Sequence, residues 1–292
     1  MSLPVVNFID ADEVIAVLEG AADAMETSPL RKGSSVVLAS RGKLLFSGDV
    51  HDYPGHLEAI VHLAALEESP DNHVVLHELI HGERLLDGMD LSYRNLARVA
   101  TLVLRFPAQV HPMLANHELA QCFRVAVSKG GGDQVAMFDA GLEYVFGGRA
   151  EEVATAIRDF VLAMPLAVRA LNGIWCSHSI PAQGDFDPAI FDRALEDTDY
   201  RGPLGGAWQV VWGRSQDPQH VRALLDRFGA KLFLVGHCHA EMGIESPADG
   251  LVVVNSDHAR GMVVSIDLAA PAPSAREVAG TATPLVNHLD PA

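Results

Sequence analysis

Short apolar runs alternate with longer amphipathic stretches along most of the chain. The short runs are rich in Val, Leu and Ile, which favours buried β-strands, whereas the longer stretches repeat their apolar residues at helical spacing. This pattern predicts strands at 43–47, 73–77, 109–115, 173–177, 231–235, 251–255 and 262–266. It predicts helices at 11–26, 55–68, 93–105, 151–164 and 219–228. Strands and helices that alternate in this way are typical of an α/β fold.

The predicted strands and helices are interleaved too closely for two independent domains. We therefore predict one large domain at 36–268, preceded by an N-terminal helical extension at 1–35 and followed by a C-terminal tail at 269–292. The tail begins near the sequence APAPSA and continues with scattered polar residues. We expect it to pack loosely against the rest of the molecule.

Composition indicates a soluble protein of the reducing cytoplasm. The chain has 292 residues, of which 49% are hydrophobic, so it can bury a large core. No apolar run approaches the roughly 20 residues that cross a bilayer, and the start MSLPVVNFIDADEV lacks the basic and apolar regions of a signal peptide. Cys122, Cys176 and Cys238 are widely spaced, which disfavours disulfides and a cysteine-based zinc site.

The formal net charge of −17 disfavours non-specific binding to nucleic acid, because the phosphate backbone would meet net repulsion. A smaller phosphate-containing substrate is compatible with this charge only if its site supplies positive charge locally.

Residue types that bind metal ions follow five of the predicted strands. The carboxyl ends of the strands in an open α/β sheet lie along one edge, so side chains far apart in sequence can converge there. Imidazole, carboxylate and amide groups suit manganese, iron or zinc, and no thiolate is needed. The sequence therefore predicts a metal site at this edge. The five segments are GDVHD (48–52), HELIHGE (77–83), ANHE (115–118), SHSIP (177–181) and GHCH (236–239).

The segment HELIH at 77–81 also matches the HExxH sequence motif of zinc proteases. That motif requires an α-helix, because both histidines must face one zinc ion while the glutamate acts as general base. Here it follows the strand-like run VVL and reaches Gly82 within one turn. The context favours the end of a strand over a protease helix.

The order of the five segments resembles that of the calcineurin-like metallophosphoesterases, most closely the phosphoprotein phosphatase branch in its bacterial type. That family carries GDxHG, GDxxDRG, GNHE, a lone His after a strand, and GH or GHxH. The resemblance extends from about Leu44 to Ile266. It implies that 36–268 is a metallophosphoesterase domain, a four-layer α/β/β/α sandwich with mixed sheets.

The resemblance also implies two divalent or trivalent metal ions, manganese, iron or zinc, a few Å apart. Its motifs assign Asp49, His51, Glu78 and His239 to the first ion. They assign Glu78, Asn116, His178 and His237 to the second ion.

Two residues depart from the family pattern. Glu78 stands where the family has a metal-bridging Asp, and a glutamate can still bridge two cations. His81 stands where the family has the Asp that orients the catalytic His. An imidazole can replace that carboxylate only as an acceptor tautomer.

The implied reaction is hydrolysis of a phosphomonoester by direct attack of a metal-bridging hydroxide, without a phosphoenzyme. His117, next to Asn116, matches the general acid that protonates the leaving oxygen. Arginines suit bidentate contact with phosphate oxygens. The candidate substrate-binding residues are Arg124, Arg214 and Arg84, the last displaced by two positions from the Arg of GDxxDRG.

The resemblance favours a serine/threonine protein phosphatase-like enzyme, whose partner is a phosphorylated protein or a small phosphoester and neither nucleic acid nor a membrane. Two alternatives stay open. The first is a dinucleoside polyphosphate or nucleotide hydrolase with the same chemistry. The second is a metal-binding pseudo-phosphatase module, because the second segment lacks the usual orienting carboxylate.

Overall fold

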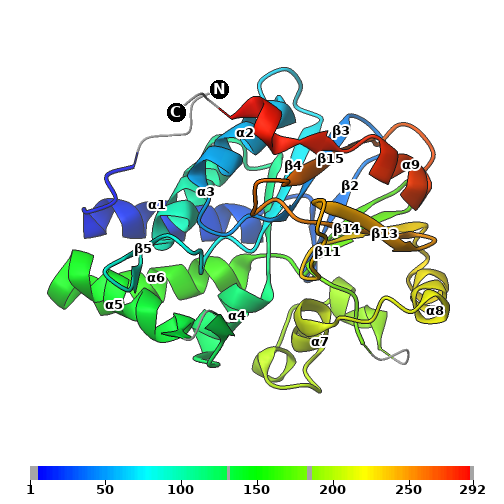
Figure 1. Ribbon diagram of the computed structural model, residues 1–292. Coiled ribbons are helices and arrows are strands. Elements are labelled where there is room, and N and C mark those ends of the chain that lie inside the picture. Colours follow the sequence, from blue (N-terminus) through cyan, green and yellow to red (C-terminus); the bar gives the residue numbers. More distant parts are fainter. Residues whose placement is uncertain (1–5, 130–131, 183–185, 290–292) are drawn as a thin grey trace.

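Two β-sheets packed face to face form the centre of the molecule in the computed structural model, which describes residues 6–129, 132–182 and 186–289 (Figure 1). In spatial order, the seven-stranded sheet contains β1 (Arg31–Lys32), β2 (Ser35–Leu38), β10 (Ala167–Ala170), β11 (Ile174–Ser177), β12 (Leu232–Val235), β14 (Leu251–Val254) and β13 (Ile244–Ala248). The five-stranded sheet contains β16 (Thr283–Pro284), β15 (Met262–Asp267), β3 (Lys43–Asp49), β4 (Asn72–His77) and β7 (Val110–Met113).

Both sheets are mixed. In the smaller sheet β3, β4 and β7 run parallel, and β15 pairs antiparallel with β3. In the larger sheet β11, β12 and β14 run parallel, and β13 pairs antiparallel with β14. Two short hairpins lie outside these sheets, β5 (Leu85–Leu86) with β6 (Met89–Asp90) and β8 (Ser128–Lys129) with β9 (Gly132–Asp133).

Helices cover the outer faces of both sheets. Helices α2 and α3 pack on the smaller sheet, α1 packs on α3 and α6, and α8 packs beside the larger sheet (Figure 1). The predicted α/β/β/α sandwich is therefore confirmed. The helices are α1 (Ala11–Glu26), α2 (Pro54–Ala64), α3 (Tyr93–Arg105), α4 (Asn116–Phe123), α5 (Gln134–Phe146), α6 (Ala150–Ala163), α7 (Gly206–Trp212), α8 (Pro218–Phe228) and α9 (Ala275–Gly280). Short 3-10 helices occupy Gly147–Arg149, Pro188–Asp192, Asp197–Tyr200 and Leu285–His288.

The layered core follows from the two-residue period of the strands. Leu44 and Phe46 of β3 join the cluster between the sheets, whereas Leu45 joins the cluster under the helices. On β12, Leu234 faces the other sheet and Phe233 faces the helices. Both faces of these strands are buried, which explains why the sequence shows continuous apolar runs instead of alternation.

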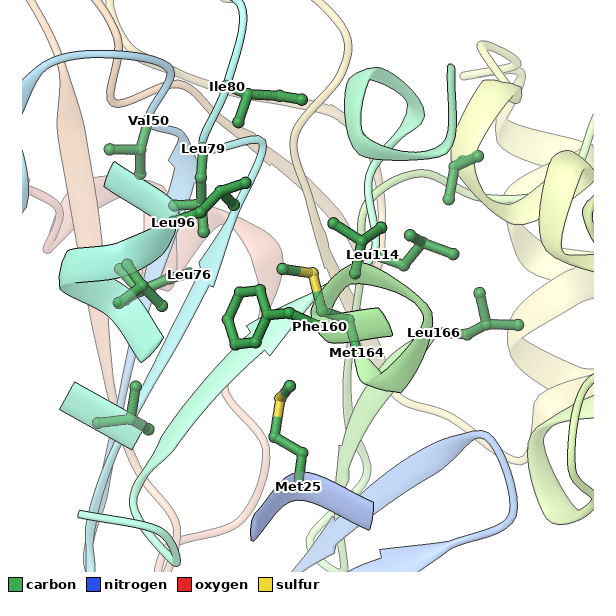
Figure 2. Close-up of a cluster of buried hydrophobic side chains, with 14 of the residues drawn as sticks. Met25, Val50, Leu76, Leu79, Ile80, Leu96, Leu114, Phe160, Met164 and Leu166 are labelled. Atoms are coloured by element: carbon green, nitrogen blue, oxygen red, sulfur yellow. The ribbon is translucent and has the colours of Figure 1, made fainter. Parts of the chain in front are cut away.

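The cluster under the helices reaches the segment that follows β4. Figure 2 shows Phe160 of α6 and Met164, the residue after this helix, beside Leu114, with Leu79 and Ile80 in the same cluster. All five side chains are buried. The chain directly after β4 is thus held by apolar side chains, and this fixes the position of its polar residues.

The two ends of the chain pack more closely than the sequence suggested. The expectation of a loosely packed tail after 269 is wrong, because α9 contacts β13, β14 and β15 with Ala275 and Val278 buried, and β16 extends the smaller sheet. At the other end, α1 belongs to the main apolar cluster, and β2 crosses the predicted boundary at 35. Within the described residues, no helix is both long and apolar enough to cross a membrane.

Candidate metal centre

The candidate site lies where the two sheets meet. Asp49, the last residue of β3, forms an isolated parallel bridge with Asn255, directly after β14 of the other sheet. A cavity of about 450 Å³ opens at this junction. Its walls include Asp49, His51, Glu78, Asn116, His117 and His237. The strand-end segments therefore converge, as the sequence predicted.

Two motif glycines permit this close approach. A Cβ on Gly48 would lie 2.0 Å from the carbonyl oxygen of Val254, and a Cβ on Gly236 would lie 2.1 Å from Oδ1 of Asp49. Any larger residue at either position would push the sheets or the carboxylate apart.

The HELIH segment is not helical. His77 is the last residue of β4, and the residues after it have irregular backbone. Glu78 and His81 have φ angles of 50° and 61°, in the left-handed region that L-residues rarely adopt. The zinc protease alternative is therefore wrong, because the two histidines do not lie one turn apart on a helix.

Backbone strain is concentrated at this site. Among the described residues, seven non-glycine residues have positive φ, and four of them belong to the predicted metal or catalytic residues. These four are His51, Glu78, His81 and His237. Such conformations cost of order 1 kcal/mol or more each and persist where the surrounding structure imposes them, which is common at functional sites.

Four side chains converge in what we call the inner ligand group, Glu78, Asn116, His178 and His237. Nε2 of His178 lies 2.6 Å from Oδ1 of Asn116, 2.9 Å from Oε2 of Glu78 and 3.2 Å from Nδ1 of His237. All four residues are buried, with at most 7% of their surface exposed. They come from the ends of β4, β11 and β12 and from the start of α4.

His77, which sequence reasoning did not select, fixes which ring nitrogen of His178 faces this group. Its Nε2–H donates to the carbonyl oxygen of Ser47 at 3.0 Å, so its Nδ1 must accept. That Nδ1 lies 2.9 Å from Nδ1 of His178, which must then donate. Burial, then the charge of His178, lowers the pKa of His77 to about 3, so this ring stays neutral. Because Nδ1–H of His178 donates to His77, Nε2 is the nitrogen that His178 can offer to a metal ion beside Asn116 and Glu78.

The donor set fits a metal ion. Asn116 Oδ1 and Glu78 Oε2 can only accept, and Nε2 of His178 lies 2.6 Å from the first and 2.9 Å from the second. Separations of 2.6 to 3.2 Å between these atoms are short enough for them to be ligands of one metal ion, whose bonds would be ~2.1 Å long. Within the described part of the chain, Glu78 Oε2 is buried without a hydrogen-bond partner. A cation in the inner ligand group would satisfy this oxygen.

A second set of side chains forms what we call the outer ligand group, Asp49, His51 and Glu78. Nε2 of His51 lies 3.1 Å from Oε1 of Glu78, and Nδ1 of His51 contacts the carbonyl oxygen of Ile80 at 2.8 Å. Asp49 accepts the backbone N–H of His237 at 3.0 Å through each carboxylate oxygen. Glu78 thus belongs to both groups, one oxygen facing each.

His239, the other residue assigned to the first ion, is exposed at the rim of the cavity, and its ring centroid is 6.1 Å from that of His258. Asp257 lines the same cavity, with Oδ2 3.8 Å from Nε2 of His51. Sequence reasoning did not select Asp257, because the segment NSDH has no metal-binding pattern of its own.

The two buried carboxylates of this site have opposite pKa shifts. Burial, followed by the negative charge of Glu78, raises the pKa of Asp49 well above its ordinary value. Glu78 behaves differently, because the charges of His117, His178 and His51 outweigh its burial and hold its pKa well below the ordinary value. A cation between the two groups would favour the ionised form of both acids.

The two predicted catalytic histidines lie side by side. The Nδ1 atoms of His81 and His117 are 3.1 Å apart, and Nε2 of His117 is 3.3 Å from Oε1 of Glu78. His117 lines the cavity, whereas His81 is fully buried behind it.

The three predicted arginines occupy different places. Arg214 lines the cavity and donates to the carbonyl oxygen of His237 at 3.0 Å. Arg124 is exposed, pairs with Asp139 of α5 and lines another cavity. Arg84 is exposed near Asp52, with a separation of 3.7 Å between Nη1 and Oδ2, and lines a third cavity. The structure thus brings only Arg214 of these three to the candidate metal centre.

Comparisons with known proteins support the fold. No family model matches the chain, and no curated protein matches it. Among solved structures, it is similar to a protein serine/threonine phosphatase from Saccharomyces cerevisiae described as similar to human phosphatase PP5, with a TM-score of 0.64 and 16% identity over 88% of this chain and 82% of that one. It is also similar to the cold-active protein-tyrosine phosphatase of a psychrophilic Shewanella species, with a TM-score of 0.52 and 14% identity over 80% and 77% of the two chains. The chain therefore has the fold of these phosphatases, at low sequence identity.

Proposed function

We propose that the protein is a metal-dependent phosphomonoesterase with two metal ions, acting on phosphorylated proteins, and that phosphoserine and phosphothreonine are its first substrates to test. The observation that carries the proposal is the inner ligand group, in which Nε2 of His178 lies 2.6 Å from Oδ1 of Asn116 and 2.9 Å from Oε2 of Glu78, so that one ion could bind all three atoms. Glu78 presents its second oxygen to His51 at 3.1 Å, which supports an adjacent site for a second ion. The similarity of the fold to solved structures of protein phosphatases supports the substrate class.

The bound ions would supply an activated water nucleophile and would stabilise negative charge on the phosphoryl oxygens. The protein side chains hold these ions in fixed positions. Asp49 and Glu78 contribute two negative charges, fewer than the four or more of two cations, so the loaded cavity is locally positive. Screening limits the influence of the distant net charge of −17 to about 10 Å.

His117 is positioned to protonate the leaving oxygen. Its Nε2 lies on the side of Glu78 and the cavity, and its Nδ1 contacts His81, so a proton on Nε2 faces the place where substrate enters. Arg214 lines the same cavity and carries a permanent positive charge for the phosphate oxygens.

The decisive experiment measures hydrolysis of p-nitrophenyl phosphate by protein loaded with manganese, iron or zinc. We expect activity in the wild-type protein and a loss of about 100-fold or more in His117→Asn, because a general acid contributes factors of this size. His220→Asn is the matched control, since this histidine bonds the Pro181 carbonyl oxygen outside the cavity. Equal rates for His117→Asn and wild type would refute the role of His117.

A substrate panel separates the proposal from its alternatives. Phosphoserine, phosphothreonine and phosphotyrosine peptides are compared with diadenosine tetraphosphate at equal concentration. Preference for a phosphopeptide supports the proposal, and preference for the dinucleotide supports the nucleotide hydrolase. Stoichiometric metal without turnover of any phosphoester would identify a pseudo-phosphatase.

A further inference from the structure

His81 occupies the position where a carboxylate was expected, and a carboxylate is present two side chains further away. Nε2 of His81 lies 3.0 Å from Oε1 of Gln121 on α4. Nε2 of Gln121 lies 2.9 Å from Oδ1 of Asp139 on α5. We propose that Gln121 and Asp139 are positioning residues that act through His81 on His117. This inference rests on the proposed function for its effect on catalysis.

His117, His81, Gln121 and Asp139 form a series of hydrogen bonds. The direction of each bond is determined by starting from Asp139. The carboxylate of Asp139 can only accept, so the amide nitrogen of Gln121 donates to it and the amide oxygen must face His81. That oxygen can only accept, so the proton of His81 lies on Nε2. The remaining nitrogen, Nδ1, then accepts from Nδ1–H of His117. Asp139 thus selects the acceptor tautomer of His81, the one form in which an imidazole can replace the missing carboxylate.

Packing holds the residues of this hydrogen-bonded series in place. The backbone N–H of His81 donates to Oγ of Ser92 at 3.1 Å, and the ring of His81 contacts Phe138 edge-on with centroids 5.7 Å apart. Phe138 and Asp139 are neighbours on α5, so the same helix supplies the packing and the carboxylate. Asp139 also pairs with Arg124 through its other oxygen. The role of Arg124 is therefore to hold Asp139, away from the substrate.

The electrostatics of His81 agree with this geometry. Burial, and then the charge of His117, lowers the pKa of His81 to about 3, so the ring remains a neutral acceptor. Hydrogen bonds that run in one direction along such a chain polarise one another, which strengthens the bond from His81 to His117.

The first test uses variants that each remove one residue from this series of hydrogen bonds. Gln121→Leu and Asp139→Ala should each lower kcat on phenyl phosphate by about 10- to 100-fold, with KM and metal content unchanged. The loss should be several-fold smaller on 2,4-dinitrophenyl phosphate, whose leaving group needs little protonation. Glu143→Ala is the matched control, because Glu143 is exposed one turn further along α5 and lines the same cavity as Asp139. It should behave as wild type.

The second test exchanges the amide and the carboxylate between positions 121 and 139. In the double variant Gln121→Glu with Asp139→Asn, the new carboxylate accepts from His81 and the new amide donates to that carboxylate, so the tautomer of His81 is kept. The double variant should regain activity to within about 3-fold of wild type, whereas each single exchange should be impaired. Equal losses on both phosphate esters, or no recovery in the double variant, would overturn the inference.

A third measurement does not depend on turnover. Nitrogen-15 spectra of the histidine rings should show His81 protonated on Nε2 in the wild-type protein, and should show a change of tautomer in Gln121→Leu. If the wild-type protein hydrolyses no phosphoester, the proposed function fails while these spectra still decide the inference. A wild-type His81 protonated on Nδ1 would overturn the inference even if the enzyme is active.

Discussion

The inner and outer ligand groups share Glu78 but differ in how completely the protein forms them. The inner group is complete, with four buried side chains connected by separations of 2.6 to 3.2 Å. The outer group has His51 3.1 Å from Glu78, while His239 is exposed at the rim and Asp257 lies 3.8 Å from His51. A site formed in advance binds its ligand without a cost of reorganisation. From this difference we expect the proposed inner metal site to bind its ion more tightly than the proposed outer one.

The cause of this difference lies in the supporting structure. His178 directly follows β11, and His237 lies two residues after the end of β12. The side chains of both strands are buried on both faces, and His77 contacts the His178 ring from behind. His51 and Asp257 lie in irregular segments after β3 and β14. Strand ends anchored in two apolar clusters position ligands more firmly than irregular segments do.

The largest expected effect comes from removing one ligand of each group. His178→Ala should abolish metal binding at the inner group and with it all activity, a loss of at least about 100-fold. His51→Ala should retain close to one equivalent of metal, because the inner group remains intact. Metal content after dialysis, measured by mass spectrometry, separates the two variants. If His51→Ala also loses all metal, the groups are not independent and the comparison fails.

The next effect concerns the residue behind the inner group. His77→Phe keeps a ring of similar size beside Phe46, whose centroid is 5.3 Å away, but removes the acceptor for Nδ1–H of His178. Metal affinity should fall by about 10- to 100-fold, as is typical when the partner of a ligating histidine is removed. Competition with a chelator measures this change. An unchanged affinity at unchanged thermal stability would show that His77 is only a packing residue.

A third prediction concerns stability and pH. Glu118 is fully buried, its Oε1 accepts the Leu79 N–H at 2.6 Å, and its burial, followed by the charge of Glu78, raises its pKa to about 7. The folded state therefore prefers the protonated form, and metal-free protein should lose stability as pH rises from about 4.5 to 7. Glu118→Gln cannot ionise and keeps the acceptor, so at pH 8 it should be more stable than wild type by about 1 to 3 kcal/mol.

Chemical denaturation at pH 4.5 and pH 8 measures this difference, which should vanish at the lower pH. Metal bound to Glu78 should also reduce the stability difference between Glu118→Gln and wild type at pH 8. The cation offsets the negative charge that helps to raise the pKa of Glu118. A stability advantage of Glu118→Gln that is independent of pH would contradict the ionisation argument.

The strands were largely predictable from the sequence because both faces of them are buried. All seven predicted strands exist, and the predicted helices at 11–26 and 93–105 agree with α1 and α3 at both ends. Helix α4 was missed because it begins at Asn116 without a side-chain cap. For α5 a starting signal was present, since Asp133 accepts from the N–H groups of Val135 and Ala136, and it was overlooked behind the glycine run.

The residues of the candidate site were likewise only partly predictable from the sequence. Ligand types at strand ends identified the inner group, because strand ends converge on one edge of a sheet. His77 could have been found from the two-residue period of β4, which places it on the same face as Val75, between the sheets. The link from His81 through Gln121 to Asp139 depends on how α5 packs on α4, and no local pattern records that packing. The same limit applies to Asp257, whose place beside His51 follows from the meeting of the two sheets.

The smallest expected effect tests the outer group directly. The sequence assigned His239 to the first metal ion, but its exposed position beside His258 predicts that His239→Ala keeps the metal content of wild type. Asp257→Asn should lower the affinity for the second equivalent of metal by only a few-fold, because a partly exposed carboxylate 3.8 Å from His51 contributes mainly through charge. Titration of the metal-free variants with manganese measures both. If His239→Ala loses one equivalent, the rim must close over the bound ion, and the outer group is completed by metal binding instead of by folding.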